Sequence, residues 1–417
     1  MRKYAPNNVS SWQTTKSDTM KHNTEKTAWI CGAAAVVMAA CGWGWAAADM
    51  QAGPGDKAAG EADDKAVRRD DITELVIGTY GENVYVYDFD RQSLEFTLKG
   101  RAEVKNASYA LAKGEHIYAV SETGSSSGAV SFRKDAKGSI RRESGLYGSG
   151  DDPCFVLLHE GQDEKGNPMT YMMTADYSGG SVSMFPIIDG MLTEMCAQLS
   201  FSGSGPVEGR QDSSHIHMLK VLPHKGQNYI LACDLGADAI RVMKSISKDL
   251  MHISDIPCPS GSGPRHMELN PQHNMLYCMT ELSGEVLVYG IDAESEEPQF
   301  TLIQQIPADE VNAGGSADIH MHPSGKWLYT SHRLDNDGIS IFDIKEDGTL
   351  EKTGYTRTAR HPRNFMITED GGYLLVACRD DRLIQTFRIG QDGSLTLTQS
   401  TLSFETDMPS GITEATE

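Results

Sequence analysis

Ionisable side chains recur at fixed distances from a repeated turn in the second half of the chain. Four of these turns begin at Pro223, Pro271, Pro323 and Glu369. The positions six residues before them hold His217, Arg265, Ala317 and Arg363, and the positions ten residues after them hold Cys233, Glu281, Arg333 and Arg379. An imidazole or a carboxylate can transfer protons, and guanidiniums bind carboxylates and phosphates through paired hydrogen bonds. If the fold gathers these residues, the pattern indicates acid–base chemistry on an anionic molecule.

The elements that must position these residues are short β-strands that repeat along the chain. Each repeat has an apolar strand, a polar turn and a second strand of alternating character. The first apolar residues of the second strands are 45 to 58 residues apart, at Val84, Val130, Val182, Ile240, Val286, Ile339 and Ile384. Such a period, built from strands alone, is typical of four-stranded propeller blades. The sequence therefore predicts an all-β, seven-bladed β-propeller. Two β-sandwich domains, the alternative, would show no fixed period.

Rotation about a propeller axis brings equivalent positions of successive blades into a ring. We therefore expect the histidine, the arginines and the glutamate to face one axial cavity. Several guanidiniums are costly to bury together unless an anion completes the set, so this cavity is expected to receive a carboxylate or a phosphate. The alternative is that the arginines only join neighbouring blades through carboxylates such as Asp234, Asp318 and Glu281.

The N-terminal segment differs from the rest of the chain. From Met20, a basic stretch is followed by the apolar run TAWICGAAAVVMAAC, which is typical of a bacterial export signal. Residues 38–41 (Met-Ala-Ala-Cys) resemble a lipoprotein cleavage box, which makes Cys41 the expected lipidation site. Cleavage after Ala48 and an uncleaved anchor are the alternatives. Residues 1–19 then look like an over-extended start, and the expected location is the periplasm or the cell envelope.

These observations divide the chain into four parts. Residues 1–48 form the N-terminal extension and the export or lipoprotein signal, and residues 49–71 form a flexible linker. Residues 72–405 form the propeller, and residues 406–417 form a C-terminal tail. The segment SLTLTQSTLSF at 394–404 is the predicted closing strand, which would pair with the first strand, LVIGTY.

Composition excludes several classes of partner. The 417 residues carry a formal net charge of −21, so the surface repels nucleic acid backbones and anionic lipid. We therefore expect no nucleic acid partner, and membrane contact only through a lipid on Cys41. The six cysteines beyond the signal show no C-x-x-C pair and are expected to be buried free thiols.

Other catalytic and cofactor motifs are weak in this sequence. His215 and His217, like His320 and His322, are spaced to share one face of a strand, but neither pair has a third ligand at a recognisable spacing. No metal and no cofactor is therefore predicted. The Gly-x-Gly pieces at 203–205 and 261–263 precede a proline and not a helix, so they do not indicate a dinucleotide fingerprint.

Four segments together resemble one known family. They are SSHIHMLKVLP with CDLGAD, GSGPRHMELNP with MTELSGEVLVY, SADIHMHPSGKWLYTSHR, and HPRNFMITEDGGYLLVACR. In order and spacing they resemble the seven-bladed propeller lactonases, a family of bacterial 6-phosphogluconolactonases and fungal carboxy-cis,cis-muconate cyclases. The resemblance covers about residues 72–405. It implies a site in the axial cleft and catalysis without a metal.

The resemblance also implies roles for individual residues. The family's catalytic positions fall on His217, Glu281, Arg265 and Arg333. Substrate binding is expected from Arg363, His320, His266 and Asp234. Because the family's sugar-phosphate enzymes act in the cytoplasm, the export signal indicates that another lactone is the everyday substrate.

The preferred function is hydrolysis of a sugar lactone that bears an anionic group. In this hypothesis the arginines hold the anionic group and His217 takes a proton from the attacking water. Glu281 either orients His217 or the water, or acts as the acid at the ring oxygen. Two alternatives remain: a non-catalytic envelope propeller that binds an anionic sugar or a protein partner, and a muconate-type cyclase.

Overall fold

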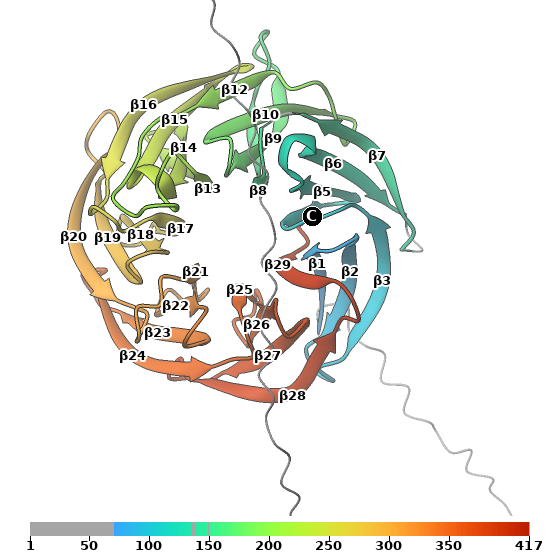
Figure 1. Cartoon of the computed structure of the whole chain (residues 1–417), viewed down its shortest axis with the longest axis vertical. Helices are drawn as coiled ribbons and strands as arrows, with labels where there is room; N and C mark the ends of the chain where they lie inside the picture. The colour runs from blue at the N-terminus through green and yellow to red at the C-terminus, as the bar shows by residue number, and fades with distance from the viewer. Residues whose placement is uncertain (1–70, 136–137, 149, 417) are drawn as a thin grey trace, which may run out of the picture. The chain divides into compact units, whose positions relative to one another are not determined.

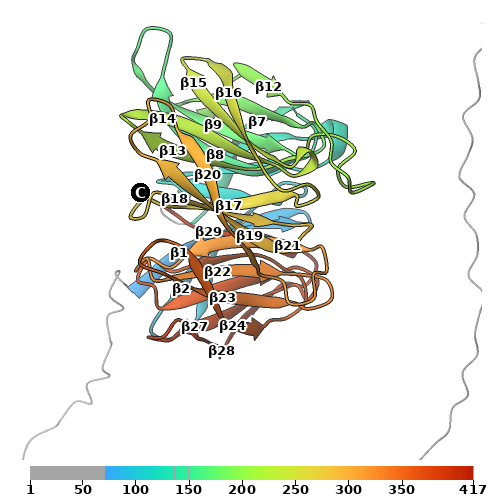
Figure 2. The ribbon, with the colours of Figure 1, turned by 90° about the vertical axis from the view of Figure 1, so that its left-hand side faces the viewer.

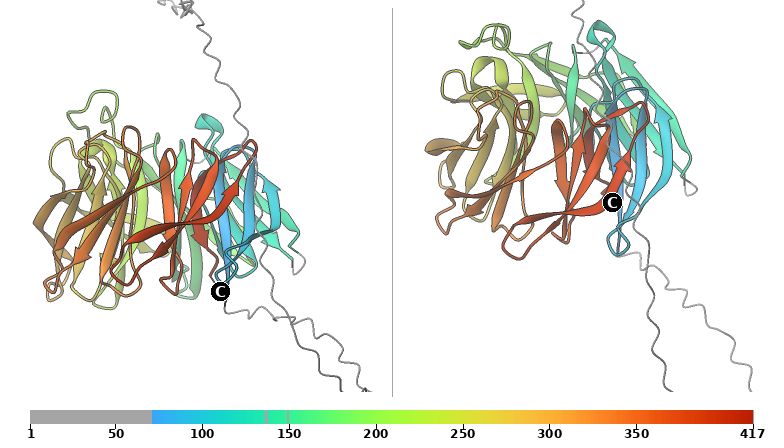
Figure 3. Two further views of the ribbon diagram at one scale, coloured as in Figure 1. Left: turned by 90° about the horizontal axis from the view of Figure 1, so that it is seen from below. Right: turned by 60° about the horizontal axis from the view of Figure 1, so that its bottom comes forward.

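The fold is a ring of seven antiparallel β-sheets (Figure 1). The computed structural model describes residues 71–135, 138–148 and 150–416. Nearly all regular structure in these residues is β-strand, with two short 3₁₀ turns, η2 (Gly124–Ser126) and η3 (Leu235–Ala237). The seven-bladed propeller predicted from the repeats is therefore confirmed. Figures 2 and 3 show the same ring from its edge.

In each blade, successive strands run from the axis outward. Blade one contains β29 (Met408–Glu414), β1 (Ile72–Tyr80), β2 (Asn83–Asp90) and β3 (Phe96–Glu103). Blade two contains β4 (Ala110–Lys113), β5 (His116–Ser121), β6 (Gly128–Lys134) and β7 (Ile140–Tyr147). Blade three contains β8 (Pro153–Gln162), β9 (Pro168–Asp176), β10 (Ser181–Ile188), β11 (Met191–Leu192) and β12 (Ala197–Ser200). Both β11 and β12 pair with β10, so the outer edge of blade three is split.

Blades four to seven follow the same order without interruption. Blade four contains β13 (Ile216–His224), β14 (Gln227–Asp234), β15 (Ala239–Ile246) and β16 (Asp249–Pro257), and blade five contains β17 (Pro264–Asn270), β18 (Met275–Thr280), β19 (Glu285–Asp292) and β20 (Gln299–Pro307). Blade six contains β21 (Ser316–Met321), β22 (Trp327–His332), β23 (Gly338–Ile344) and β24 (Leu350–Arg357), and blade seven contains β25 (Pro362–Ile367), β26 (Tyr373–Cys378), β27 (Leu383–Ile389) and β28 (Leu395–Ser403).

The strand that closes the ring is β29, not the segment predicted from the sequence. Residues 394–404 contain β28, which pairs with β27 at the outer edge of blade seven. The ring closes where β29 pairs with β1, so residues 408–414, assigned to a C-terminal tail, belong to the propeller. The prediction was wrong because β29 (MPSGITE) is short and rich in small residues, and it gives little hydrophobic signal. In contrast, β28 alternates between exposed and half-buried residues, as an outer strand does.

Burial explains the two kinds of strand in each repeat. The second strand of a blade packs against neighbouring blades on both faces, and every residue of β26 is buried. Outer strands such as β20 have one face in solvent and alternate. The seven repeat anchors, Val84 to Ile384, all lie near the start of third strands and have no exposed surface. The period read from the sequence is therefore the period of the blades.

Tight turns between third and fourth strands follow from local chemistry. In blade six, the Asp347 carboxylate accepts hydrogen bonds from the backbone N–H and the hydroxyl of Thr349 at 3.0 and 2.6 Å. Gly348 between them has a φ of 81°, which favours glycine. Asp392, Gly393 and Ser394 repeat this arrangement in blade seven. An Asp-Gly pair flanked by strands is thus enough to set the turn.

In several blades, a tyrosine hydroxyl donates a hydrogen bond to this turn of the next blade. The Tyr277 hydroxyl of blade five donates to the Gly348 carbonyl of blade six at 2.8 Å. Tyr329 of blade six donates to the Gly393 carbonyl of blade seven at 2.9 Å. Apolar clusters fill the space between such blades, so each blade is stabilised by the next.

The closing strand provides a test of the architecture. Ile412 of β29 is 2% exposed and packs with Leu75, Ile77 and Leu375. We expect Ile412→Ala to lower the free energy of unfolding by about 2–4 kcal/mol, because it leaves a cavity at the closure. Leu397→Ala in β28, where the side chain is 51% exposed, is the matched control and should change it by less than about 0.5 kcal/mol. Urea denaturation of the two variants measures the difference, and equal effects would contradict closure by β29.

Candidate active site

A first ring of side chains surrounds the axis at bulges in the innermost strands. In six blades the pairing of the inner strand shifts near its start, and the residue at or beside the shift is Ser410, Cys154, His217, Arg265, Ala317 or Arg363. A β-bulge reorients the side chain that it contains. Five of these residues, together with Ser108 of blade two, line one narrow axial cavity. The predicted convergence of His217, Arg265 and Arg363 is therefore present.

The axial cavity is small. Its lining also includes Tyr109, His266 and Asn364, and it offers about 10 Å³ of water-accessible space. That is about what one water molecule requires. A ligand larger than a water molecule would therefore contact the first-ring side chains at the opening of this cavity.

A second ring lies where the second strands end. The backbone N–H of the first residue after the second strand donates to a carbonyl two residues before the first-ring position. Six blades make this bond, through Glu122, Tyr177, Leu235, Glu281, Arg333 and Arg379, at 2.8 to 3.2 Å. Tyr80 occupies the matching place at the end of β1. The repeat thus fixes a second level of side chains above the bulges.

Cys233 is not part of the second ring. The sixteen-residue spacing between the two rings holds for Arg265 with Glu281 and for Arg363 with Arg379. In blade four the equivalent of Glu281 is Leu235, because that blade has two additional residues between the rings. Cys233 instead lies fully buried within β14.

Glu281 holds three guanidiniums together. Its Oε1 lies 2.6 Å from an Arg210 nitrogen, and its Oε2 lies 2.7 Å from Arg265 Nε and 3.2 Å from an Arg333 nitrogen. The Arg265 Nε–H is not in line with that oxygen, so this contact is an ion pair rather than a hydrogen bond. Burial raises the pKa of Glu281, but Arg333, Arg265 and Arg210 outweigh it and lower the pKa to about 2. Glu281 is therefore an ionised carboxylate at neutral pH.

The arginines therefore do join blades, as the alternative expected, and Arg265 and Arg363 also line the axial cavity. Arg265 of blade five is 1% exposed and Arg333 of blade six is 6% exposed. Arg265 donates to the Ala317 carbonyl at 2.6 Å, and Arg333 donates to the Gly315 carbonyl at 2.7 Å. Burial lowers the pKa of Arg333 to about 9, which still leaves it cationic at neutral pH.

Arg363 belongs to a second polar chain, which connects blade seven with blades one and two. Its guanidinium donates to the Tyr80 hydroxyl at 2.8 Å, and that hydroxyl donates to Glu122 at 2.9 Å. Burial raises the pKa of Tyr80, so it stays a neutral phenol. Among the residues that the structure describes, the four guanidiniums at 210, 265, 333 and 363 contact only two carboxylates, Glu281 and Glu122, directly or through Tyr80. The site carries excess positive charge in a chain of net charge −21.

His217 is a neutral imidazole at this site. It is 5% exposed, and its ring packs edge-on against Tyr177 and His266 at centroid distances of 5.7 and 5.1 Å. Among the residues that the structure describes, its buried Nδ1 has no hydrogen-bond partner. Burial, followed by the charge of Arg265, holds the pKa of His217 well below its usual range.

The other predicted binding residues occupy different levels. His266 lines the axial cavity and its Nδ1 lies 2.7 Å from Asp318. His320 lies further along β21, against the other oxygen of Asp318 at 3.0 Å, and lines a separate cavity of about 250 Å³. Asp234 lies apart from the cluster. It is fully buried and accepts hydrogen bonds from Ser214 and Arg241 within its own blade.

Three residues of the axial cluster, two in the second ring and one in a loop, were not predicted from the sequence. Arg210 lies in the connection between β12 and β13, outside any repeat, and nothing in its sequence context marks it. Tyr80 and Glu122 end the repeat segments LVIGTY and YAVSE at the position where Glu281 ends YCMTE. Extending the alignment to the first two blades would have found them.

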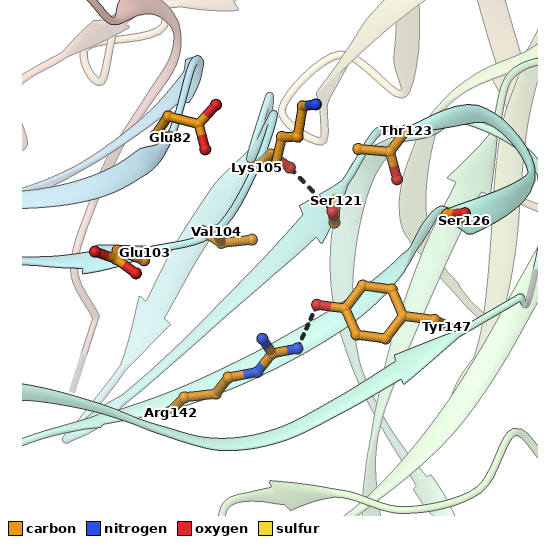
Figure 4. Close-up of a pocket in the computed structure, with 9 residues that line it drawn as sticks. All are labelled: Glu82, Glu103, Val104, Lys105, Ser121, Thr123, Ser126, Arg142 and Tyr147. Atoms are coloured by element: carbon orange, nitrogen blue, oxygen red, sulfur yellow. Dashed lines mark hydrogen bonds between the residues drawn. The ribbon is translucent and has the colours of Figure 1, made fainter.

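A larger cavity than the axial one lies elsewhere in the ring. It lies between blades one and two, has a volume of about 680 Å³, and is lined by Glu82, Glu103, Val104, Lys105, Ser121, Thr123, Ser126, Arg142 and Tyr147 (Figure 4). None of the axial arginines lines it. It nevertheless adjoins the second ring, since Ser121 and Thr123 flank Glu122 along the chain.

Several expectations concern metals, membranes and thiols. Within residues 71–135, 138–148 and 150–416, no group of three or more metal-ligating side chains is placed to hold an ion, and no helix has the length and hydropathy to span a bilayer. The six described cysteines are free thiols, and four of them are buried, as predicted. Cys41, the export signal and nearly all of the linker lie outside the described residues.

Comparisons with known proteins identify the family to which this fold belongs. Residues 74–410 match the family described as "Lactonase, 7-bladed beta-propeller". A 6-phosphogluconolactonase of Formosa agariphila is 30% identical over 323 residues, which are 74% of this chain and 88% of that protein.

Two crystal structures share the fold. One is of a candidate 6-phosphogluconolactonase from Bacteroides uniformis, with 36% identity, a TM-score of 0.75, and coverage of 83% of this chain and 100% of that one. The other is of a Pseudomonas aeruginosa periplasmic gluconolactonase, with 25% identity, a TM-score of 0.71, and coverage of 82% and 99%. The chain matches these proteins over their whole length, and it belongs to the seven-bladed β-propeller lactonase family.

Proposed function

We propose that this protein hydrolyses a sugar lactone bearing an anionic group, and that the axial site performs the reaction. Family membership supports lactone hydrolysis in general. The observation that carries the finer proposal is the excess of guanidiniums over carboxylates beside a neutral imidazole, at one opening of the ring.

The arginines bind the anionic group of the substrate. Arg363 and Arg265 both line the axial cavity, and their guanidiniums are fixed by Tyr80, Ala317 and Glu281. A carboxylate or phosphate there would be bound by donors that are already ordered, so little entropy is lost on binding. Arg333 lies behind these two guanidiniums and supports them. It donates hydrogen bonds to two backbone carbonyls and forms an ion pair with Glu281.

A neutral imidazole accepts the proton of the attacking water, and the sequence predicted His217 for this role. Water adds its oxygen to the lactone carbonyl carbon and gives up a proton to the imidazole; the bond from that carbon to the ring oxygen then breaks, and the ring oxygen receives the proton. A neutral imidazole is the form that this step needs. The nearby guanidiniums also stabilise the negative oxygen of the tetrahedral intermediate.

Glu281 keeps the guanidiniums in place and does not act as the acid. Its two oxygens lie against three arginines, and its low pKa leaves no proton to donate at neutral pH. Of the two roles that the sequence left open for this carboxylate, positioning is the one we propose, and the groups it positions are arginines rather than His217.

We further propose that the protein acts outside the cytoplasm. The support is the export-type segment that begins at Met20 and the likeness to a periplasmic gluconolactonase. Lipidation at Cys41 remains part of this proposal, and mass spectrometry of the mature protein would detect it.

The anion-binding role of Arg363 can be tested with two lactones. The purified protein should open 6-phosphogluconolactone and glucono-1,5-lactone faster than buffer does. We expect Arg363→Gln to lower kcat/KM for the phosphorylated lactone roughly 10- to 150-fold, the effect of losing a charged hydrogen bond worth about 1.5–3 kcal/mol. The neutral lactone should be affected less.

Arg133→Gln is the control for this experiment, since Arg133 lies on the outer surface and pairs only with Glu115 among the described residues. It should leave both rates unchanged. Equal losses for the two lactones in the Arg363 variant would show that this arginine does not contact the anion. Wild-type rates no higher than those in buffer would remove the lactonase proposal.

The pH dependence of kcat/KM tests the state of the site. The pKa of Glu281 lies at about 2, that of His266 at about 4 and that of Arg333 at about 9, and that of His217 lies well below 6.5. Between pH 5 and 8 the imidazoles of His217 and His266 therefore stay neutral and the guanidiniums charged. With a lactone whose only ionisable group is a carboxylate, we expect kcat/KM to show no inflection in this range after subtraction of hydroxide-catalysed opening. An inflection near 6.5 would mean that an ordinary histidine controls the rate.

A further inference from the structure

We propose that Asp318 is a positioning residue that fixes His266 as a second proton acceptor of the axial site, with Nε2 as its free nitrogen. The proposal deepens the lactonase function proposed above and depends on it for its kinetic consequence. It changes the role of His266 from substrate binding to proton transfer.

Asp318 is the centre of a buried hydrogen-bond network between blades five, six and seven. The residue is 1% exposed. Its Oδ1 lies 2.7 Å from His266 Nδ1 and accepts from the Ile319 N–H at 3.0 Å. Its Oδ2 lies 3.0 Å from His320 Nε2 and accepts from the Phe365 N–H at 3.1 Å and from the Asn364 amide.

These partners determine where the protons are. Both carboxylate oxygens face donors that cannot accept, namely two backbone N–H groups and a side-chain amide. Burial raises the pKa of Asp318, but His320 and His266 outweigh it and hold the pKa well below its usual range, so the group is a carboxylate and its histidine partners donate. His266 therefore carries its proton on Nδ1, and a neutral His266 offers an unprotonated Nε2.

His266 Nε2 is available to the site. The His266 ring lines the axial cavity and packs edge-on against His217 and Phe155. Within the described part of the chain, Nε2 has no hydrogen-bond partner. Burial, followed by the charge of Arg265, lowers the pKa of His266 to about 4, so the ring is neutral at physiological pH.

The two imidazoles differ in what stabilises their protonated form. No carboxylate contacts His217 among the residues described, and the charges nearest to it are guanidiniums. His266 has the Asp318 carboxylate against Nδ1, so a positive charge formed when Nε2 takes the water proton is stabilised directly. An anionic substrate would also offset the field of Arg265. We therefore assign transfer of the water proton to His266 Nε2, and its return to the ring oxygen to the same atom, with His217 orienting the water.

His320 has a different place in the network. Burial lowers its pKa, but the Asp318 and Glu268 carboxylates outweigh burial and raise it. His320 lies on the side of Asp318 that faces away from the axial cavity, and there it balances the charge of Asp318. It does not line the axial cavity. It therefore provides a matched control, because it contacts the same carboxylate without touching the reacting atoms.

The test combines tautomer measurement with kinetics. In wild-type protein labelled with ¹⁵N-histidine, the His266 signals, assigned with His266→Gln, should report a protonated Nδ1 and a pyridine-type Nε2 at pH 7. Asp318→Asn should shift the proton to Nε2, because the new amide can donate to Nδ1, and should lower kcat roughly 100-fold or more with KM within a few-fold. His320→Gln should keep the tautomer and change kcat less than about 5-fold.

The outcomes separate this inference from the lactonase proposal. A wild-type His266 protonated on Nε2 would overturn the inference even if Asp318→Asn failed to fold. Full kcat in a folded Asp318→Asn variant would also overturn it, as would a loss in His320→Gln equal to that in Asp318→Asn, since this indicates a merely structural role. A wild-type protein that opens no lactone would instead remove the lactonase proposal, while the tautomer reading would still stand.

Discussion

Burial of positive charge at the propeller axis is the constraint on which the site depends. Arg265 and Arg333 have almost no exposed surface, and a guanidinium removed from water is costly unless a carboxylate neutralises it. Glu281 contacts both and also Arg210, so one carboxylate permits three cations to lie together. Because its oxygens are used in this way, Glu281 is not free for proton transfer. The excess charge that remains is what an anionic substrate would neutralise, and this links the stability of the cluster to its binding chemistry.

The fold repeats one backbone geometry around the axis, but the side chains at the repeated positions differ from blade to blade. Six blades offer one bulged inner-strand position, and each blade offers one position at the end of its second strand. Blades four, five and seven place an imidazole and two guanidiniums in the first ring, whereas blades one to three place Ser410, Ser108 and Cys154 there. The cavity is therefore cationic on one side and small and weakly polar on the other. The cavity between blades one and two adjoins Glu122 on this second side, and if the arginines bind the anionic group as proposed, it offers space for the rest of the substrate.

This distinction explains what could be predicted from the sequence. The strand period, the blade number and the alignment of Arg265, Glu281, Arg333 and Arg363 are local patterns that rotation repeats, and they were predictable. Arg210 was not, because it reaches Glu281 from a connection that no repeat constrains. The insertion in blade four displaced the alignment from Leu235 to Cys233, since a constant offset cannot register two additional residues. The grouping of Asp318 with His266 and His320 depends on contacts between blades, which a one-dimensional pattern does not contain.

The closing strand and the site belong to one hydrogen-bond network. Asn364 donates its amide to Asp318 and accepts the backbone N–H of Ile412 in β29 at 2.7 Å. The carboxylate that orients His266 is therefore only one side chain away from the strand that completes the ring. If β29 separated from β1, Asn364 would lose its backbone partner, and a buried amide oxygen without a donor is costly. Ring closure and ordering of the Asp318 network are thus coupled, which gives a physical reason why a short strand of small residues pairs at this position instead of the longer β28.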